Sequence, residues 1–227
     1  ILNEPFNEGF TRWQDGNGNP DYLSRISDAA SLDRVLDDIF DDWSGLKVLT
    51  YQLGDLLEHA LRRVDVHVIF LRRRNLLAAV VSNLIALQTN LWQSWEAKGP
   101  IDAYYERLEP LRVSDVEELL EWNKRRLAEV DAVISSRSSP TFRVVFEDVH
   151  LADQHAQRRW LAELWSFLGV EPVDHEQVAY HLDPSSVQMA SPERYGRLPN
   201  ATEINDALGS DDTGWLTFLP TRRQGFP

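Results

Sequence analysis

The feature that most constrains this chain is a short apolar segment, residues 66–71, that ends in three arginines and is followed at once by a helix-like run, residues 76–92. β-Branched residues favour a strand in the first segment, and the helix begins where that strand stops. The backbone N–H groups at a helix start carry partial positive charge and can bind an anion. Arg74 adds a planar fork of donors that can hold phosphate through two hydrogen bonds, and Ser82 follows two helical turns later. The segment therefore predicts a phosphate site that contains Arg74 and Ser82.

The alternation of strand and helix extends along most of the chain. Strands are expected at residues 46–51, 66–71 and 141–146. Helices are expected after a cap at Ser31 and at residues 53–63, 76–92, 114–135 and 154–168. Strands that alternate with helices are typical of a parallel sheet with helical crossovers, and 227 residues suit one such domain. We therefore predict an α/β fold of one domain, residues 1–227, in which helices flank a parallel β-sheet.

Charge and composition exclude several classes of function. The formal net charge of -13 argues against duplex nucleic acid as a partner, because binding to phosphates needs an excess of Lys and Arg. The chain has no cysteine, which excludes disulfides and thiolate zinc sites. No apolar run reaches the roughly 20 residues that span a bilayer, and no signal peptide is visible. We expect no metal, no nucleic acid partner and no membrane span, and we expect a cytoplasmic protein.

Residues 67–82 also resemble the nucleotide 3′-phosphate motif of the sulfotransferases that use 3′-phosphoadenosine 5′-phosphosulfate (PAPS). In that family a strand runs into Arg-Asn-Pro, and a Ser follows eight residues after the Arg. Arg74 and Ser82 match this pattern, whereas Leu76 stands where the family has Pro. Further segments that are similar to family elements, in the same order, are residues 45–49, 144–149, 165–170 and 193–204.

The resemblance implies a three-layer α/β/α fold of the P-loop NTPase-like type. It also implies transfer of a sulfuryl group from PAPS, as co-substrate, to a hydroxyl or amine of a small or mid-sized acceptor such as a carbohydrate, lipid or natural product. In the family, the first strand and the 5′-phosphosulfate loop precede a segment like Glu4-Pro5-Phe6, and no such loop occurs in these residues. We therefore expect that loop to lie upstream of Ile1; a relative that has lost its donor loop and does not catalyse transfer is the alternative.

The resemblance assigns roles to further residues. Glu4 is the expected catalytic base that takes the proton of the acceptor, and Glu8 is the reserve. Lys47, at the start of a strand, is the second catalytic residue and is expected to balance charge on the substrate or the leaving group. Arg194 and Arg197, in a late basic loop, are expected to contact the nucleotide. The acceptor and the oligomeric state are not predicted by the sequence.

Several of these residues also have an ordinary structural interpretation. Arg74 could pair with Glu147 or Asp148, and these two acids are expected to cap a helix rather than to bind a metal ion. A serine in an apolar helix usually bonds to the carbonyl one turn back, which is the alternative for Ser82. A nucleotide or small-molecule kinase of a related phosphate-loop fold also stays open, and it would require Mg²⁺ and a lysine-bearing phosphate loop.

Overall fold

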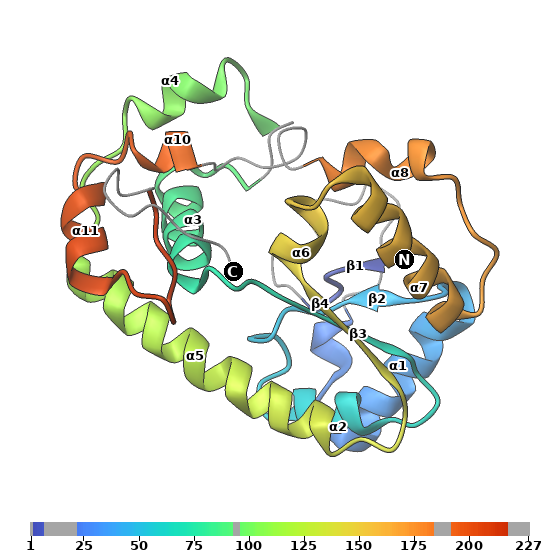
Figure 1. The fold of residues 1–227 in the computed structure, drawn as a ribbon. Coiled ribbons are helices and arrows are strands. Elements are labelled where there is room, and N and C mark those ends of the chain that lie inside the picture. Colours follow the sequence, from blue (N-terminus) through green and yellow to red (C-terminus); the bar gives the residue numbers. More distant parts are fainter. Residues whose placement is uncertain (1, 7–21, 93–95, 184–191, 218–227) are drawn as a thin grey trace. The chain divides into compact units, whose positions relative to one another are not determined.

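The computed structural model describes residues 2–6, 22–92, 96–183 and 192–217, and it has a mixed α/β fold that is mostly helical (Figure 1). The chain divides into two compact units. Unit 1 consists of residues 1–68 and 125–141, and unit 2 consists of residues 69–124 and 142–227. The mixed α/β class predicted from the sequence is confirmed, and the single-domain organisation stays a prediction.

Unit 1 contains a two-stranded parallel sheet, β1 (Leu2–Asn3) and β2 (Leu46–Lys47). Its helices are η2 (Leu23–Arg25), α1 (Ala29–Asp42), α2 (Leu56–Arg62) and the second part of α5 (Val113–Ser135). Apolar side chains from β1 and one face of α1 form the core of this unit: Leu2, Phe6, Tyr22, Leu32, Val35, Leu36 and Ile39. The parallel pairing of β1 with β2 agrees with the predicted parallel arrangement.

The start of α1 differs from the prediction by three residues. Asp28, not Ser31, is the N-cap, and its carboxylate accepts the backbone N–H of Ser31 at 2.7 Å. The Ser31 hydroxyl in turn accepts the backbone N–H of Asp28 at 2.9 Å. This reciprocal capping box satisfies two donors that the first turn of the helix leaves without intrahelical partners. The apolar periodicity located the helix, but an aspartate further upstream supplies the cap.

The strand and helix predicted at residues 46–51 and 53–63 are both shorter in the structure. β2 ends at Lys47 because Leu49 and Gln52 form a turn, in which the N–H of Leu49 donates to the side-chain oxygen of Gln52 at 2.9 Å. Leu53 and Gly54 then have positive φ angles of 66° and 51°, which an α-helix does not allow. For that reason α2 begins only at Leu56.

Unit 2 holds nearly all of a second two-stranded sheet, β3 (Val68–Arg72) and β4 (Thr141–Val145). Its helices are α3 (Leu76–Thr89), α4 (Ile101–Tyr105), the first part of α5, α6 (Phe146–His150), α7 (Gln154–Leu168), α8 (His175–Leu182), α10 (Pro192–Tyr195) and α11 (Ala201–Leu208). The extent of α7 and its end at Gly169, with φ 65°, are confirmed. Other predicted boundaries move: β3 begins at Val68 and ends at Arg72, and β4 ends at Val145. In addition, α3 ends before Asn90, whose φ is 53°, and α5 begins at Val113.

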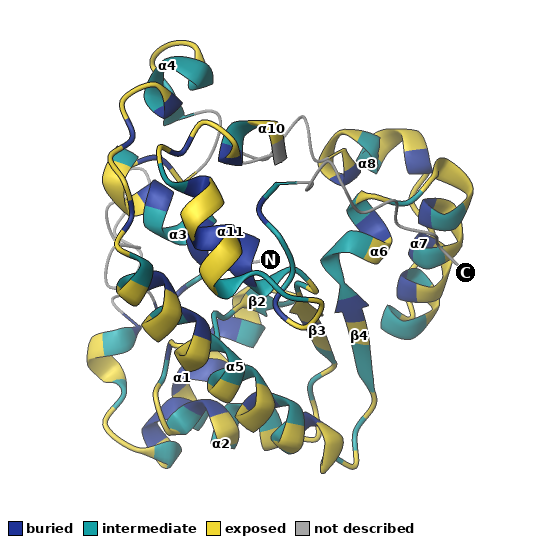
Figure 2. Ribbon diagram, turned by 60° about the vertical axis from the view of Figure 1, so that its left-hand side comes forward, coloured by how far each residue is buried: buried dark blue, intermediate teal, exposed yellow. Residues whose placement is uncertain are grey.

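The core of unit 2 is built around α3, which is buried over much of its surface (Figure 2). The largest cluster combines α3 with side chains from α4, α5 and α11, among them Leu77, Val81, Tyr105, Val116 and Ile204. A second cluster joins β4, α6, α7 and α8 through Val144, Val149, Leu161 and Leu182. Because α3 is held firmly by this packing, the side chains that it presents elsewhere have fixed positions.

Candidate functional site

The start of α3, where the sequence predicts a phosphate, is occupied by two acidic side chains of α6. The carboxylate of Glu147 accepts the backbone N–H of Arg74 at 2.8 Å and that of Asn75 at 3.0 Å. A negative charge is favourable there because the helix start carries partial positive charge. Asp148 pairs with the guanidinium of Arg74 at 2.6 Å, and this hydrogen bond raises the pKa of Arg74. The ordinary interpretation of Arg74, pairing with the adjacent acids, is therefore what the structure shows.

The remaining N–H groups of the first turn of α3 also have partners within the protein. The side-chain oxygen of Asn75 accepts the N–H of Ala78 at 2.9 Å, and the N–H of Leu77 donates to the carbonyl of Thr213 at 2.8 Å. The Asn75 amide donates to the carbonyl of Trp215 at 2.8 Å, which ties the helix start to the segment after α11. Protein acceptors therefore take these backbone donors in the structure, and their use for a phosphate stays a prediction.

A cavity of about 270 Å³ lies one turn further along, against a different face of α3. The helix presents Ala79, Ser82, Asn83 and Ala86 to it, and these positions share one face because they are three, four and seven residues apart. The small side chains of the two alanines leave room, while Ser82 and Asn83 are polar. Other residues of unit 2 complete the wall: Arg73, Ile85, Leu91, Trp92 and Tyr105. The structure therefore places Ser82 in a cavity together with Arg73 rather than Arg74.

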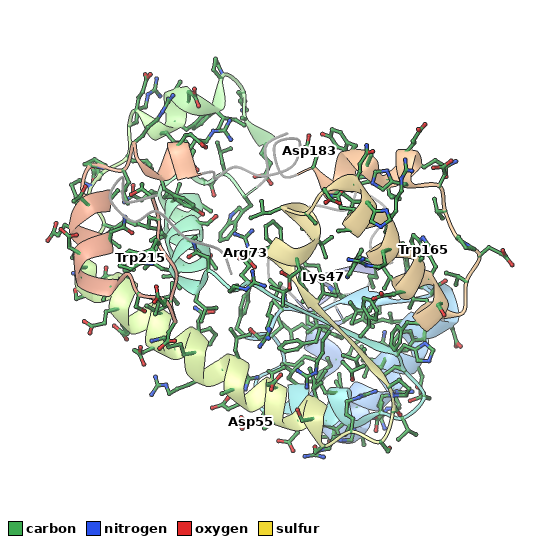
Figure 3. The ribbon with its side chains drawn as sticks, viewed as in Figure 1. Lys47, Asp55, Arg73, Trp165, Asp183 and Trp215 are labelled. Carbon is green, nitrogen blue, oxygen red and sulfur yellow. The ribbon has the colours of Figure 1, made fainter. Side chains whose placement is uncertain are left out.

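Arg73, labelled in Figure 3, follows the last residue of β3 and lines this cavity. Its guanidinium lies over the ring of Phe146, 4.4 Å from the centroid. The charge of Arg73 also acts on the phenol of Tyr195 and lowers the pKa of that group, against the effect of burial. Among the described residues no carboxylate forms an ion pair with Arg73.

Tyr195 of α10 lies against α3. Its side chain is buried, and its hydroxyl donates to the carbonyl of Ala78 at 2.9 Å, one turn before Ser82. Burial raises the pKa of Tyr195, although the nearby charge of Arg73 opposes this, so the phenol stays protonated.

His150 also contacts Phe146, and the two rings stack with centroids 4.2 Å apart. The Nδ1 atom of His150 is 3.0 Å from the carbonyl of Leu182, which fixes the tautomer with hydrogen on Nδ1. Burial lowers the pKa of His150, and the charge of Arg73 lowers it further. The imidazole is therefore neutral near pH 7, and its pKa depends on the charge of Arg73.

The predicted nucleotide contacts Arg194 and Arg197 meet a shared acid in unit 2. Asp102 of α4 lies 3.5 Å from Arg194 and 3.0 Å from Arg197. Neither arginine lines the cavity, although Arg194 is close enough for its charge to act on the buried phenol of Tyr105. Both roles stay predictions.

The two residues predicted as catalytic, Glu4 and Lys47, form an ion pair in unit 1. The Lys47 ammonium lies 2.6 Å from the Glu4 carboxylate, and the backbone N–H of Glu4 donates to the carbonyl of Lys47 at 3.1 Å. Glu4 directly follows β1 and has a positive φ of 51°, which is uncommon for a residue with a side chain. The pair therefore places a carboxylate and a cation side by side. Glu8, the reserve base, lies outside the described residues.

The sequence did not single out three residues at or near the cavity: Arg73, Asn83 and Tyr195. Arg73 was one of three consecutive arginines, and only the position where β3 ends decides which of them faces the cavity. Asn83 directly follows Ser82 in the sequence, and this position on the helix was a usable signal. Tyr195 lies more than 100 residues away in sequence, and its role follows from tertiary contacts alone.

No group of three acidic or histidine side chains suited to a metal ion occurs in the described part of the chain. Within the same residues, no helix is both long and apolar enough to cross a membrane. Comparisons of the chain with protein families, with curated proteins and with solved structures found no match. The function is therefore argued from the geometry of the cavity and from the residue patterns.

Proposed function

We propose that this protein is a sulfotransferase that transfers the sulfuryl group of PAPS to a hydroxyl or amine of a small or mid-sized acceptor. The observation that supports this best is the cavity wall on which Arg73 and Ser82 lie together. A guanidinium that has no carboxylate partner in the described part of the chain and a hydroxyl are suitable donors for a phosphate group. The mixed α/β fold and the parallel β1–β2 pair are compatible with the three-layer P-loop-like arrangement that belongs to the same proposal.

The proposed nucleotide contacts differ by one residue from those expected from the motif. Arg73 takes the role that the motif gives to Arg74, because the donors of Arg74 are used by Glu147 and Asp148. Ser82 keeps its expected role as the hydroxyl that contacts the 3′-phosphate. The aromatic side chains of Trp92 and Tyr105 on the same cavity offer flat apolar surface to the nucleoside part.

The proposed chemistry is an in-line transfer. The acceptor oxygen or nitrogen forms a bond to sulfur, the bond between sulfur and the phosphate oxygen of the donor breaks, and 3′-phosphoadenosine 5′-phosphate leaves with the electron pair. Glu4 takes the proton of the acceptor, and Lys47 stabilises the negative charge of the leaving group. Their ion pair means that Lys47 must release the carboxylate before Glu4 can act as a base. No metal ion is needed in this scheme.

Binding and transfer test the two parts of the proposal separately. Calorimetry on the full-length protein is expected to show binding of 3′-phosphoadenosine 5′-phosphate in the micromolar range and weaker binding of adenosine. Radiolabelled PAPS with a panel of hydroxyl and amine acceptors is expected to yield a labelled product, and Glu4→Gln is expected to abolish it without loss of nucleotide binding. Absence of nucleotide binding would contradict the proposed function. Tighter binding of ATP with Mg²⁺ would instead favour a kinase.

A further inference from the structure

The side-chain amide of Asn83 lies on the wall of the cavity in unit 2. The residue is half-buried in the middle of α3, and in the described part of the chain its amide has no hydrogen-bond partner. Asparagines in two other helices of the same unit use their amides internally. Asn123 of α5 donates to the carbonyl of Leu119 at 2.8 Å, and Asn205 of α11 donates to a threonine hydroxyl at 2.8 Å. Since none of the described residues takes it up, the amide of Asn83 is available to a ligand.

Helix stability does not account for an asparagine at this position. Asparagine is a poorer helix former than leucine or alanine, which are frequent in α3, because its side chain competes for backbone hydrogen bonds. Ala79 and Ala86 lie four residues before and three residues after Asn83, so the three side chains share one face of the helix. The small alanine side chains leave open space beside the amide. This combination of a free amide and adjacent space indicates a role in binding.

We infer that Asn83 is the residue that selects adenine as the base of the bound nucleotide. This inference rests on the proposed function for the presence of a nucleotide in the cavity. An asparagine amide carries a donor and an acceptor side by side. Adenine presents the complementary pair, a 6-amino donor and the N7 acceptor, whereas guanine presents two acceptors, O6 and N7. The amide therefore forms two hydrogen bonds with adenine and cannot form both with the same edge of guanine.

The other walls of the cavity do not distinguish one purine from another in this way. Trp92 and Tyr105 offer aromatic rings, and stacking on a ring tolerates every base because every base has a flat face. Arg73 and Ser82 are assigned to the 3′-phosphate. A base that stacks on an aromatic side chain keeps its polar edge free, and Asn83 supplies the matching donor and acceptor from α3.

The test measures whether a preference for the 6-amino group depends on Asn83. The two ligands are 3′-phosphoadenosine 5′-phosphate and its analogue with an unsubstituted purine base, which has hydrogen in place of the amino group. Calorimetry gives both affinities for the unaltered protein, for Asn83→Leu, which removes the amide at similar size, and for Asn83→Asp, which keeps an acceptor and loses the donor. Asn123→Leu is the matched control, because Asn123 is also a half-buried helix residue of unit 2 but does not line the cavity. Thermal unfolding confirms that each variant is folded, and Asn83→Asp carries the test if Asn83→Leu does not fold.

We expect the unaltered protein and Asn123→Leu to bind the adenine ligand about tenfold more tightly than the analogue, of the order of one base contact through two hydrogen bonds. Asn83→Leu should bind the two ligands with equal affinity. Asn83→Asp should bind both more weakly and keep the preference, because the carboxylate accepts from the amino group and repels N7. The inference is overturned if the unaltered protein has no preference, if Asn83→Leu keeps it, or if Asn83→Asp binds the adenine ligand as tightly as the unaltered protein. In each of these cases the bisphosphate still binds, so the sulfotransferase proposal stands.

A further measurement covers the case in which the proposed function itself fails. If the unaltered protein binds neither bisphosphate, the sulfotransferase proposal is wrong, and ATP with Mg²⁺ becomes the probe, compared with the triphosphate of unsubstituted purine riboside. A preference for ATP that Asn83→Leu abolishes and Asn123→Leu keeps would retain Asn83 as the residue that selects adenine. A preference that persists in Asn83→Leu, or no binding of ATP to the unaltered protein, overturns the inference as well.

Discussion

The start of α3 and the cavity wall of the same helix differ in how their hydrogen-bond donors are used, although each includes one of two consecutive arginines, Arg74 and Arg73. At the start of the helix, the amide N–H groups of Arg74 and Asn75 donate to Glu147, and the guanidinium of Arg74 pairs with Asp148. At the cavity wall, Arg73 lies over the ring of Phe146 and has no carboxylate partner among the described residues. The first region resembles an anion site whose anion is supplied by the protein.

The difference teaches that an anion site is defined by donors that remain after internal pairing. Displacing Glu147 from α3 would leave a carboxylate without its two amide partners, which costs free energy that a ligand would have to overcome. Binding at Arg73 avoids this cost as far as the described residues are concerned, because none of their carboxylates pairs with Arg73. The comparison therefore ranks the two arginines as phosphate contacts in the reverse order of the sequence motif.

Arg73→Gln is expected to have the largest effect on nucleotide binding. Removal of a charged donor from a site that binds a phosphate costs about 2–3 kcal/mol, which corresponds to an affinity loss of about 30- to 150-fold for 3′-phosphoadenosine 5′-phosphate. Calorimetry measures this change. Arg73→Lys keeps the charge but loses the planar fork, so its affinity should lie between those of the unaltered protein and Arg73→Gln. The matched control is Arg74→Gln, for which less than about twofold change is expected because Asp148 neutralises that arginine. A larger loss of affinity for Arg74→Gln than for Arg73→Gln would indicate that the phosphate binds at the start of α3 instead.

Glu147→Gln is expected to reduce stability rather than binding. The amide keeps one oxygen acceptor for the N–H groups of Arg74 and Asn75 but loses the charge and the second oxygen. We expect the free energy of unfolding to fall by about 1–2 kcal/mol, measured by urea denaturation, with nucleotide affinity unchanged. The control Glu117→Gln, at an exposed position of α5, should change neither quantity. A marked gain in phosphate affinity for Glu147→Gln would show that the helix start can serve as an anion site once its internal carboxylate is removed.

The contrast between Arg73 and Arg74 also shows where sequence reasoning ends. Periodicity and caps correctly gave α7, most of α3 and α5, and the mixed α/β class, because these depend on residues close together in sequence. The motif predicts a site at the β3–α3 connection, and Ser82 lines a cavity in the structure. Which arginine faces that cavity depends on the residue at which β3 ends, and local propensity does not determine such a boundary to one residue.

Contacts between distant segments were the second limit. The partners that fill the start of α3 come from α6 and from the segment after α11, so no local pattern around Arg74 reveals that its donors are in use. Tyr195 reaches Ala78 across 117 residues of sequence for the same reason. In unit 1, by contrast, the pairing of β1 with β2 joins Glu4 to Lys47, two residues that the family resemblance had already selected.

Ser82→Ala is expected to have a smaller effect on binding than the Arg73 substitution. A hydroxyl contributes a neutral donor, so we expect nucleotide affinity to fall by about three- to tenfold. Thr89→Val on the same helix is the matched control, since its hydroxyl donates to the carbonyl of Ile85 at 2.8 Å, one turn back, and does not line the cavity. Equal effects of the two substitutions would mean that Ser82 acts only through the local helix geometry.

The smallest expected effect is on the pKa of His150, and it tests most directly whether the charge of Arg73 is free. Burial and the Arg73 guanidinium lower that pKa from its ordinary value of 6.5. Because the folded protein disfavours the protonated imidazole, His150 contributes stability above pH 6.5, and this contribution is lost as the pH falls through the folded pKa. Arg73→Gln should raise the pKa of His150 and reduce this loss, as should saturation with 3′-phosphoadenosine 5′-phosphate. Arg74→Gln should not, since Asp148 already balances that charge. An NMR titration of the His150 ring measures this pKa. Equal pKa shifts in the two arginine variants would mean that both charges act on His150 to the same extent, which would contradict the distinction between the two regions.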